Sequence, residues 1–113
     1  MSDRLRSIVA ENGGFPVSDE QCSILQKNHL AISVDGAATV LGGVNIGWAA
    51  VHLQDSRSNI ISDKTGSATN INKDEGSQDT ANVQFYKSLV SAINALDWNA
   101  ASQEVTRYRS IAR

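Results

Sequence analysis

The sequence predicts an α+β domain in which an antiparallel four-stranded β-meander packs against N-terminal and C-terminal helices. Apolar residues recur at helical spacing in both terminal parts of the chain. Residues 30–62 instead alternate between short β-prone runs and turn residues. Helices that are segregated from an antiparallel sheet define the α+β class. Because 113 residues is the length of one typical domain, we expect a single domain over residues 1–113.

Two short helices are expected at the N-terminus. Residues 2–12 place apolar side chains on one helical face, and the glycine pair that follows ends this helix. Ser18 and Gln21 have the spacing of a capping box, in which each side chain bonds the backbone N–H of the other residue. This box predicts the start of a second helix over about residues 19–28.

The four strands of the predicted meander are joined by short turns. Asp35-Gly36 is a strong signal for a two-residue hairpin turn, and Gly42-Gly43 predicts the next turn. Gly47, inside the longest strand, indicates a bulge or a close approach of another backbone. The expected strands are residues 30–34, 37–41, 44–53 and 59–62.

Residues 63–79 are almost free of apolar side chains, so we expect a long polar loop there, in which an edge strand at 68–71 can lie. A helix capped by Thr80 then runs to about Leu96, and two apolar stripes cover most of its surface. Such a helix is buried on more than one side, so we expect it to lie across the sheet and also to meet another helix or a second subunit. The predicted homo-oligomer is a dimer formed through the C-terminal helices or a sheet edge. The expected contact residues are Phe85, Tyr86, Leu89 and Ile93.

The last helix is expected to begin at Asp97 or Asn99 and to reach about Ala112. Its basic residues are Arg107, Arg109 and Arg113. Basic side chains at a helix C-terminus complement the helix dipole. The alternative is a contact for an anion or for an acidic partner.

Trp48 and His52 are four residues apart in the longest predicted strand, so they share one face of the sheet. If that face is turned toward the core, His52 is a partly buried, hydrogen-bonded histidine. The alternative is a ligand pocket in which Trp48 is a stacking wall and His52 a polar handle. The pattern does not decide which face of residues 44–53 is buried. Asp35 is a third candidate for ligand binding, beside its role in the expected turn.

The segments "SVDGA" and "IGWAAVHL", followed by a helix ending in "SAINAL", resemble the start of ribonuclease H domains. In that family, an aspartate of the first strand and a glutamate of the helix bind catalytic magnesium. The resemblance implies that Asp35 matches the aspartate. The glutamate position falls near Gln84 or Phe85, and neither residue is an anionic ligand for magnesium. The resemblance therefore implies a degenerate ribonuclease H-like domain as a minor alternative.

Composition and charge exclude several other classes of protein. The formal net charge of −2 gives no broad attraction to nucleic acid or anionic lipid, so we expect neither as a partner. Cys22 is the only cysteine, so we expect no cysteine zinc site, no other metal ion and no cofactor. The sequence shows neither a secretory signal nor an apolar run that could span a bilayer, which predicts a cytoplasmic protein.

No set of side chains in the sequence converges on a catalytic arrangement. The sequence therefore predicts a small soluble accessory protein that is not an enzyme and that acts as a homo-oligomeric binding or interaction protein. The alternative is a small-molecule-binding α+β domain, with or without enzymatic activity, whose pocket is near Trp48 and His52.

Overall fold

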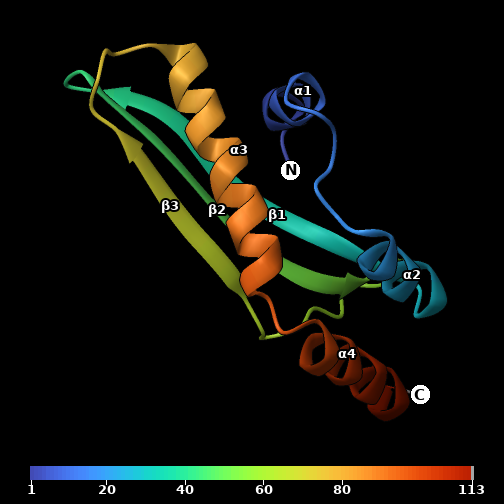
Figure 1. Ribbon diagram of the computed structural model, residues 1–113. Coiled ribbons are helices and arrows are strands. Elements are labelled where there is room, and N and C mark those ends of the chain that lie inside the picture. Colours follow the sequence, from blue (N-terminus) through green and yellow to red (C-terminus); the bar gives the residue numbers. More distant parts are fainter. Residues whose placement is uncertain (113) are drawn as a thin grey trace.

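The computed structural model describes residues 1–112, which form four helices and one three-stranded antiparallel sheet (Figure 1). The α+β class is confirmed. The molecule is elongated, with extents of 52 × 23 × 22 Å. The elements in chain order are α1 (Asp3–Glu11), α2 (Asp19–Lys27), β1 (Leu30–Leu41), β2 (Val44–Asp55), β3 (Gly66–Asn72), α3 (Gln78–Ala95) and α4 (Trp98–Ala112).

Local capping signals place the helix starts. Ser2 accepts a hydrogen bond from the Leu5 N–H at the start of α1. The capping box of α2 is confirmed, because the Gln21 N–H donates to Ser18 Oγ (3.1 Å) and the Ser18 N–H donates to Gln21 Oε1 (2.9 Å). Helix α3 begins earlier than expected: Ser77, not Thr80, is its cap.

The sheet has three strands in the order β1-β2-β3, and the expected four-stranded meander is wrong in two places. Asp35-Gly36 does not turn the chain, because β1 pairs with β2 in one unbroken register from Leu30 to Leu41. Gly36 has no positive φ, whereas Gly42 and Gly43 do (57° and 79°), and that second pair forms the hairpin turn.

The second correction concerns the third strand. Residues 59–62 form no strand: Ile61 makes only an isolated bridge to Gln54. Instead, the third strand is β3, which lies inside the polar segment 63–79. This segment is predicted to be a loop that can contain an edge strand at 68–71. A polar sequence suits this place because β3 is an edge strand whose outer side meets solvent.

Helix α3 lies across one face of the sheet, and the core is between them (Figure 1). Three strand glycines, Gly36, Gly47 and Gly66, allow this close packing, and a Cβ at Gly66 would overlap the backbone of Ala92 in α3. A Cβ at Gly36 would meet the Phe85 ring, and a Cβ at Gly47 would overlap the backbone of Gln84 and Phe85. The close backbone approach predicted at Gly47 is confirmed, and the ladder passes this residue without a bulge.

Candidate functional site

The two faces of the sheet differ in burial. Val34 of β1 and Val51 of β2 pair in register and are buried against α3. Side chains alternate along a strand, so residues one position away point to the opposite face. Trp48 is on this opposite face and is 41% exposed. The exposure of Trp48 shows that this face is not the core side of the sheet, whereas His52 itself is partly buried and hydrogen-bonded, as the first alternative predicted.

We call this opposite face the open face. Its exposed members, which include Asp35, Thr69 and Ile71 (56% exposed), show that no described segment covers its middle. By register, the open face comprises Ala31, Ser33, Asp35, Ala37, Thr39 and Leu41 of β1, Val44, Ile46, Trp48, Ala50, His52 and Gln54 of β2, and Ser67, Thr69 and Ile71 of β3.

The register brings the three ligand-binding candidates together. Asp35 is directly opposite Ala50, and Trp48 and His52 are two residues before and after Ala50. Diagonal neighbours on adjacent antiparallel strands are about 7–8 Å apart at their backbones, within reach of long and aromatic side chains. Asp35 is therefore a diagonal neighbour of both Trp48 and His52, and the small side chain of Ala50 lies between the three.

His52 is half-buried, and its ring orientation is fixed by the segment that follows β2. Its Nδ1 is 3.3 Å from the Ser62 carbonyl oxygen and 3.3 Å from Thr65 Oγ1. A carbonyl oxygen only accepts hydrogen bonds, so Nδ1 donates to Ser62 in the tautomer that carries the proton on Nδ1. In that tautomer Nε2 has the free lone pair and acts as an acceptor.

Of the three arginines predicted as an anion contact, the structure describes Arg107 and Arg109, and these two have different surroundings. Arg109 has an internal role: its Nε donates to Asp55 Oδ2 (2.8 Å), and its Nη atoms donate to the carbonyls of Asn28 and His29 (2.7 and 2.8 Å). His29 has a positive φ of 53°, and Arg109 ties this turn to the end of β2. Arg113 lies outside the described residues.

This contact also changes the acidity of Asp55. The hydrogen bond from Arg109 is the main cause, and the Arg57 backbone N–H adds to it, lowering the pKa of Asp55 from 3.8 to about 2. Both donors favour the ionised carboxylate. The Asp55–Arg109 pair, which we call the clasp, is therefore a structural ion pair between β2 and α4.

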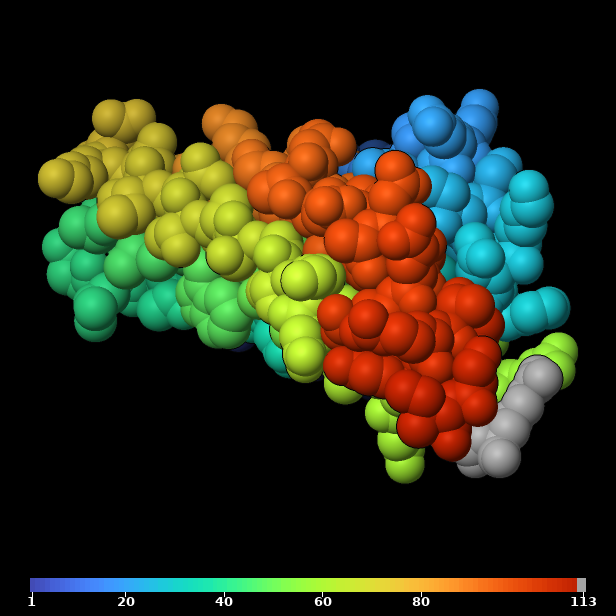
Figure 2. All heavy atoms as spheres, turned by 90° about the horizontal axis from the view of Figure 1, so that it is seen from below, coloured from blue at the N-terminus to red at the C-terminus, as the bar shows by residue number. Residues whose placement is uncertain are grey.

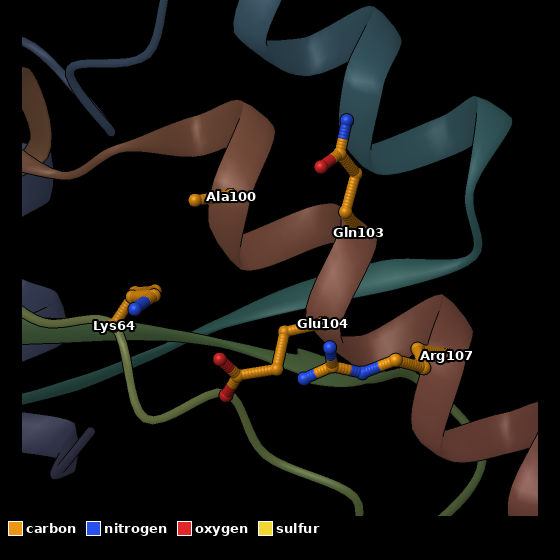
Figure 3. A pocket seen from close by; sticks show the side chains of 5 residues that line it. All are labelled: Lys64, Ala100, Gln103, Glu104 and Arg107. Atoms are coloured by element: carbon orange, nitrogen blue, oxygen red, sulfur yellow. The ribbon is translucent and has the colours of Figure 1, made fainter.

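Arg107 lines a shallow hollow of about 340 Å³ between α4 and the segment after β2. Figure 2 shows this yellow-green segment against the red α4. In Figure 3 the Arg107 guanidinium points toward the Glu104 carboxylate, which itself accepts from the Asp63 N–H. An anion placed here would meet this carboxylate, so the hollow does not favour an anion. Its lining residues are Lys64, Ala100, Gln103, Glu104 and Arg107.

The residues expected to join subunits are mostly internal. Phe85, Leu89 and Ile93 have no exposed surface, because they pack within the chain, whereas Val83 on the same helix is 38% exposed. Tyr86 is half-buried, and its hydroxyl donates to the Gly14 carbonyl (2.7 Å), which connects α3 to the N-terminal helices. The expected site of self-association is therefore corrected. The buried side chains of Phe85, Leu89 and Ile93 cannot contact a second copy.

The positions matched to ribonuclease H do not converge. Gln84 is buried on the side of α3 that faces Gly47, whereas Asp35 is exposed on the opposite face of the sheet. Within residues 1–112 no three His, Cys, Asp or Glu side chains come together in a way that could hold a metal ion.

Sequence reasoning placed Ala50 on the face of Trp48 and His52 but missed Thr69 and Ile71 as parts of the open face. The alternation of Ser67, Thr69 and Ile71 was the available signal, but the polar composition around it concealed the strand.

No described helix has the length and apolar character needed to cross a membrane. The chain matches no protein-family model, no curated protein and no solved structure.

Proposed function

We propose that this protein is a non-enzymatic interaction protein that binds a protein partner on the open face of its sheet. The observation that carries this proposal is the exposure of Trp48 (41%) and Ile71 (56%) on a face that no described segment covers. An antiparallel sheet with one solvated face normally presents polar side chains there. Exposed apolar groups bounded by polar residues are instead typical of interaction surfaces.

The composition of the open face fits a protein partner. Trp is enriched among the residues that dominate binding energy at protein interfaces. Around Trp48, the small side chains of Ala37 and Ala50 leave room for a partner to approach, and Thr69 and Ser67 supply a polar rim. A second copy of this chain is one form such a partner can take, and self-association would then use this face instead of α3.

A site-specific cross-linking experiment tests this proposal. Photoreactive p-benzoylphenylalanine replaces either Ile71, on the open face, or Val83, an exposed apolar residue (38%) of α3. After illumination in an extract of its native cells, we expect a discrete adduct from position 71 and none from position 83. Unlabelled wild-type protein should compete the adduct away, and the Trp48→Ala variant should not.

The mass of the adduct identifies its origin. Twice the chain mass indicates a second copy, and any other discrete mass indicates a different protein. Equal cross-linking from both positions, or an adduct that wild-type protein does not compete, would contradict binding on the open face.

A further inference from the structure

The polar groups of the open face show what chemistry a partner must present. Asp35 is the only residue with a formal charge among the members of this face. The ion pairs found within residues 1–112 are Arg6–Asp3 and Arg109–Asp55, so Asp35 has no basic partner in the described part of the chain. An exposed carboxylate on an apolar face is complemented by a cation.

The other two groups around Ala50 restrict the kind of cation. Trp48 presents an exposed indole ring, and aromatic rings attract cations placed over their faces. In the tautomer that donates from Nδ1 to the Ser62 carbonyl, His52 offers Nε2 as an acceptor. Asp35 thus supplies a carboxylate, His52 a second acceptor and Trp48 an aromatic ring. The small side chain of Ala50 lies between them.

A guanidinium group matches all three features. It is planar and stacks on an aromatic ring, it carries five N–H donors, and it binds a carboxylate through two parallel hydrogen bonds. An ammonium group is a compact, strongly hydrated charge that does not stack in this way. We infer that the open face binds an arginine side chain of the partner protein, between Trp48 and His52 and against Asp35. This inference rests on the proposed function and names the group that is recognised.

The apolar surroundings favour an arginine within a polypeptide. Ile46 and Ile71 pair in register beyond Trp48 and extend the apolar surface along the sheet. A residue beside the arginine in the partner segment can pack there. The open face then recognises a short segment with one arginine next to an apolar side chain.

Chemical-shift mapping on the full ¹⁵N-labelled chain tests this inference with three blocked tripeptides. These are acetyl-Leu-Arg-Ala-amide, the same peptide with citrulline, which has nearly the same shape without the charge, and the same peptide with lysine. We expect the arginine peptide to shift the amide signals of Asp35 and Ala50 and the indole N–H signal of Trp48. The citrulline peptide should bind at least about tenfold more weakly, as expected on loss of a charge-assisted hydrogen bond.

Two variants make the result specific. Asp35→Asn should weaken binding of the arginine peptide by about tenfold or more, whereas Glu11→Gln, which removes an exposed acid on α1, should leave it unchanged. Both substitutions are at exposed positions, and matching spectra of the variants show that they fold.

The possible outcomes separate this inference from the proposed function. Equal affinity for the arginine and citrulline peptides, or shifts confined to the hollow beside Glu104, would overturn arginine recognition. If the arginine peptide fails while the cross-link from position 71 is still formed and competed, the open face is an interaction surface of another specificity. If self-association is lost in both Trp48→Ala and Asp35→Asn, the occupant is a second copy and not a different protein.

Discussion

Gly47 determines how closely α3 packs on the sheet. The Gln84 and Phe85 backbone occupies the space that a side chain at this position would need. The Ser88 hydroxyl lies 2.8 Å from the Gly47 carbonyl oxygen and 2.9 Å from that of Gln84, so it can donate to either. Strand and helix are thus in direct backbone contact here, and neither can move without loss of hydrogen bonds.

We therefore expect Gly47→Ala to lower the free energy of unfolding by about 3 kcal/mol, at the upper end of the overpacking range. Urea denaturation followed by far-ultraviolet circular dichroism measures this change. The control is Ala50→Ser, which adds one heavy atom to the opposite face and should change stability by less than about 0.5 kcal/mol. A similar effect of the two substitutions would contradict the packing described.

Asn45 is a second residue on which several contacts depend. Its side chain is fully buried, donates to the carbonyl of Glu75 (2.7 Å) and to Asn72 Oδ1 (3.2 Å), and accepts from the Ser77 N–H (2.8 Å). These bonds hold the connection between β3 and α3 in place. A buried asparagine whose hydrogen-bonding groups all have partners fixes the conformation of the backbone around it.

Replacement of this residue with alanine leaves the Ser77 N–H and the Glu75 carbonyl without their partner. We expect Asn45→Ala to reduce the free energy of unfolding by about 2 kcal/mol, the usual cost of unsatisfied buried groups. The matched control, Asn59→Ala, removes the same side chain from an exposed turn and should have little effect. The midpoint of thermal unfolding is measured for both variants. Equal midpoints would contradict the role of Asn45 in holding the connection between β3 and α3.

Among the elements, α4 is joined to the sheet by the clasp between Asp55 and Arg109. Because the native contacts hold the pKa of Asp55 at about 2, below its ordinary 3.8, the folded state binds fewer protons than the unfolded state between these values. The stability contributed by the clasp is fully present above about pH 4 and is lost as the pH falls toward 2.

We expect the free energy of unfolding to fall over this acidic window in the wild-type protein and to fall less in Asp55→Asn. The variant should also be less stable at pH 7, because Arg109 loses its ionic partner. Urea denaturation at a series of pH values measures both effects. Asp63→Asn, which removes an exposed acid, should keep the wild-type slope, and an unchanged slope in Asp55→Asn would contradict the assignment.

The elements differ in how well the sequence predicts them. Caps and apolar periodicity are local, and they located all four helices to within a few residues. The turn expected at Asp35-Gly36 failed because pairing with β2 along all of β1 overrides the local preference, and Gly36 is needed for the contact with Phe85. Strand β3 lacks an apolar pattern because its inward residues, such as Asn70 and Asn72, bond polar groups of the core.

The candidate site shows the same division. Trp48, His52 and Asp35 were selected as residues with useful chemistry, and the spacing of Trp48 and His52 placed those two on one face. Whether that face is buried depends on which side of the sheet α3 packs against. The alternation of small and large residues along β2 does not predict this side. The close approach of α3 at Gly36, Gly47 and Gly66 requires that the helix covers the other side.

At the scale of the whole molecule, the covered and open faces place the two tryptophans in contrasting environments. Trp98 is 9% exposed, and its indole N–H donates to the Ile93 carbonyl (2.9 Å) at the junction of α3 and α4. Trp48 is 41% exposed on the open face. The fluorescence of Trp48 therefore reports on the open face, and that of Trp98 reports on the buried junction of the two helices. A comparison of the two measures whether the open face is accessible to solvent.

We expect acrylamide to quench the fluorescence of Trp98→Phe, which reports Trp48, several times more strongly than that of Trp48→Phe, which reports Trp98. The reason is that a collisional quencher must reach the ring, and only the open face exposes one. The measurement is made over a dilution series. Equal quenching of both variants at every concentration would contradict an open face. Strong quenching of Trp48 that disappears as the concentration rises would show that a second copy covers this face, and unchanged quenching over the series leaves it free for a different protein.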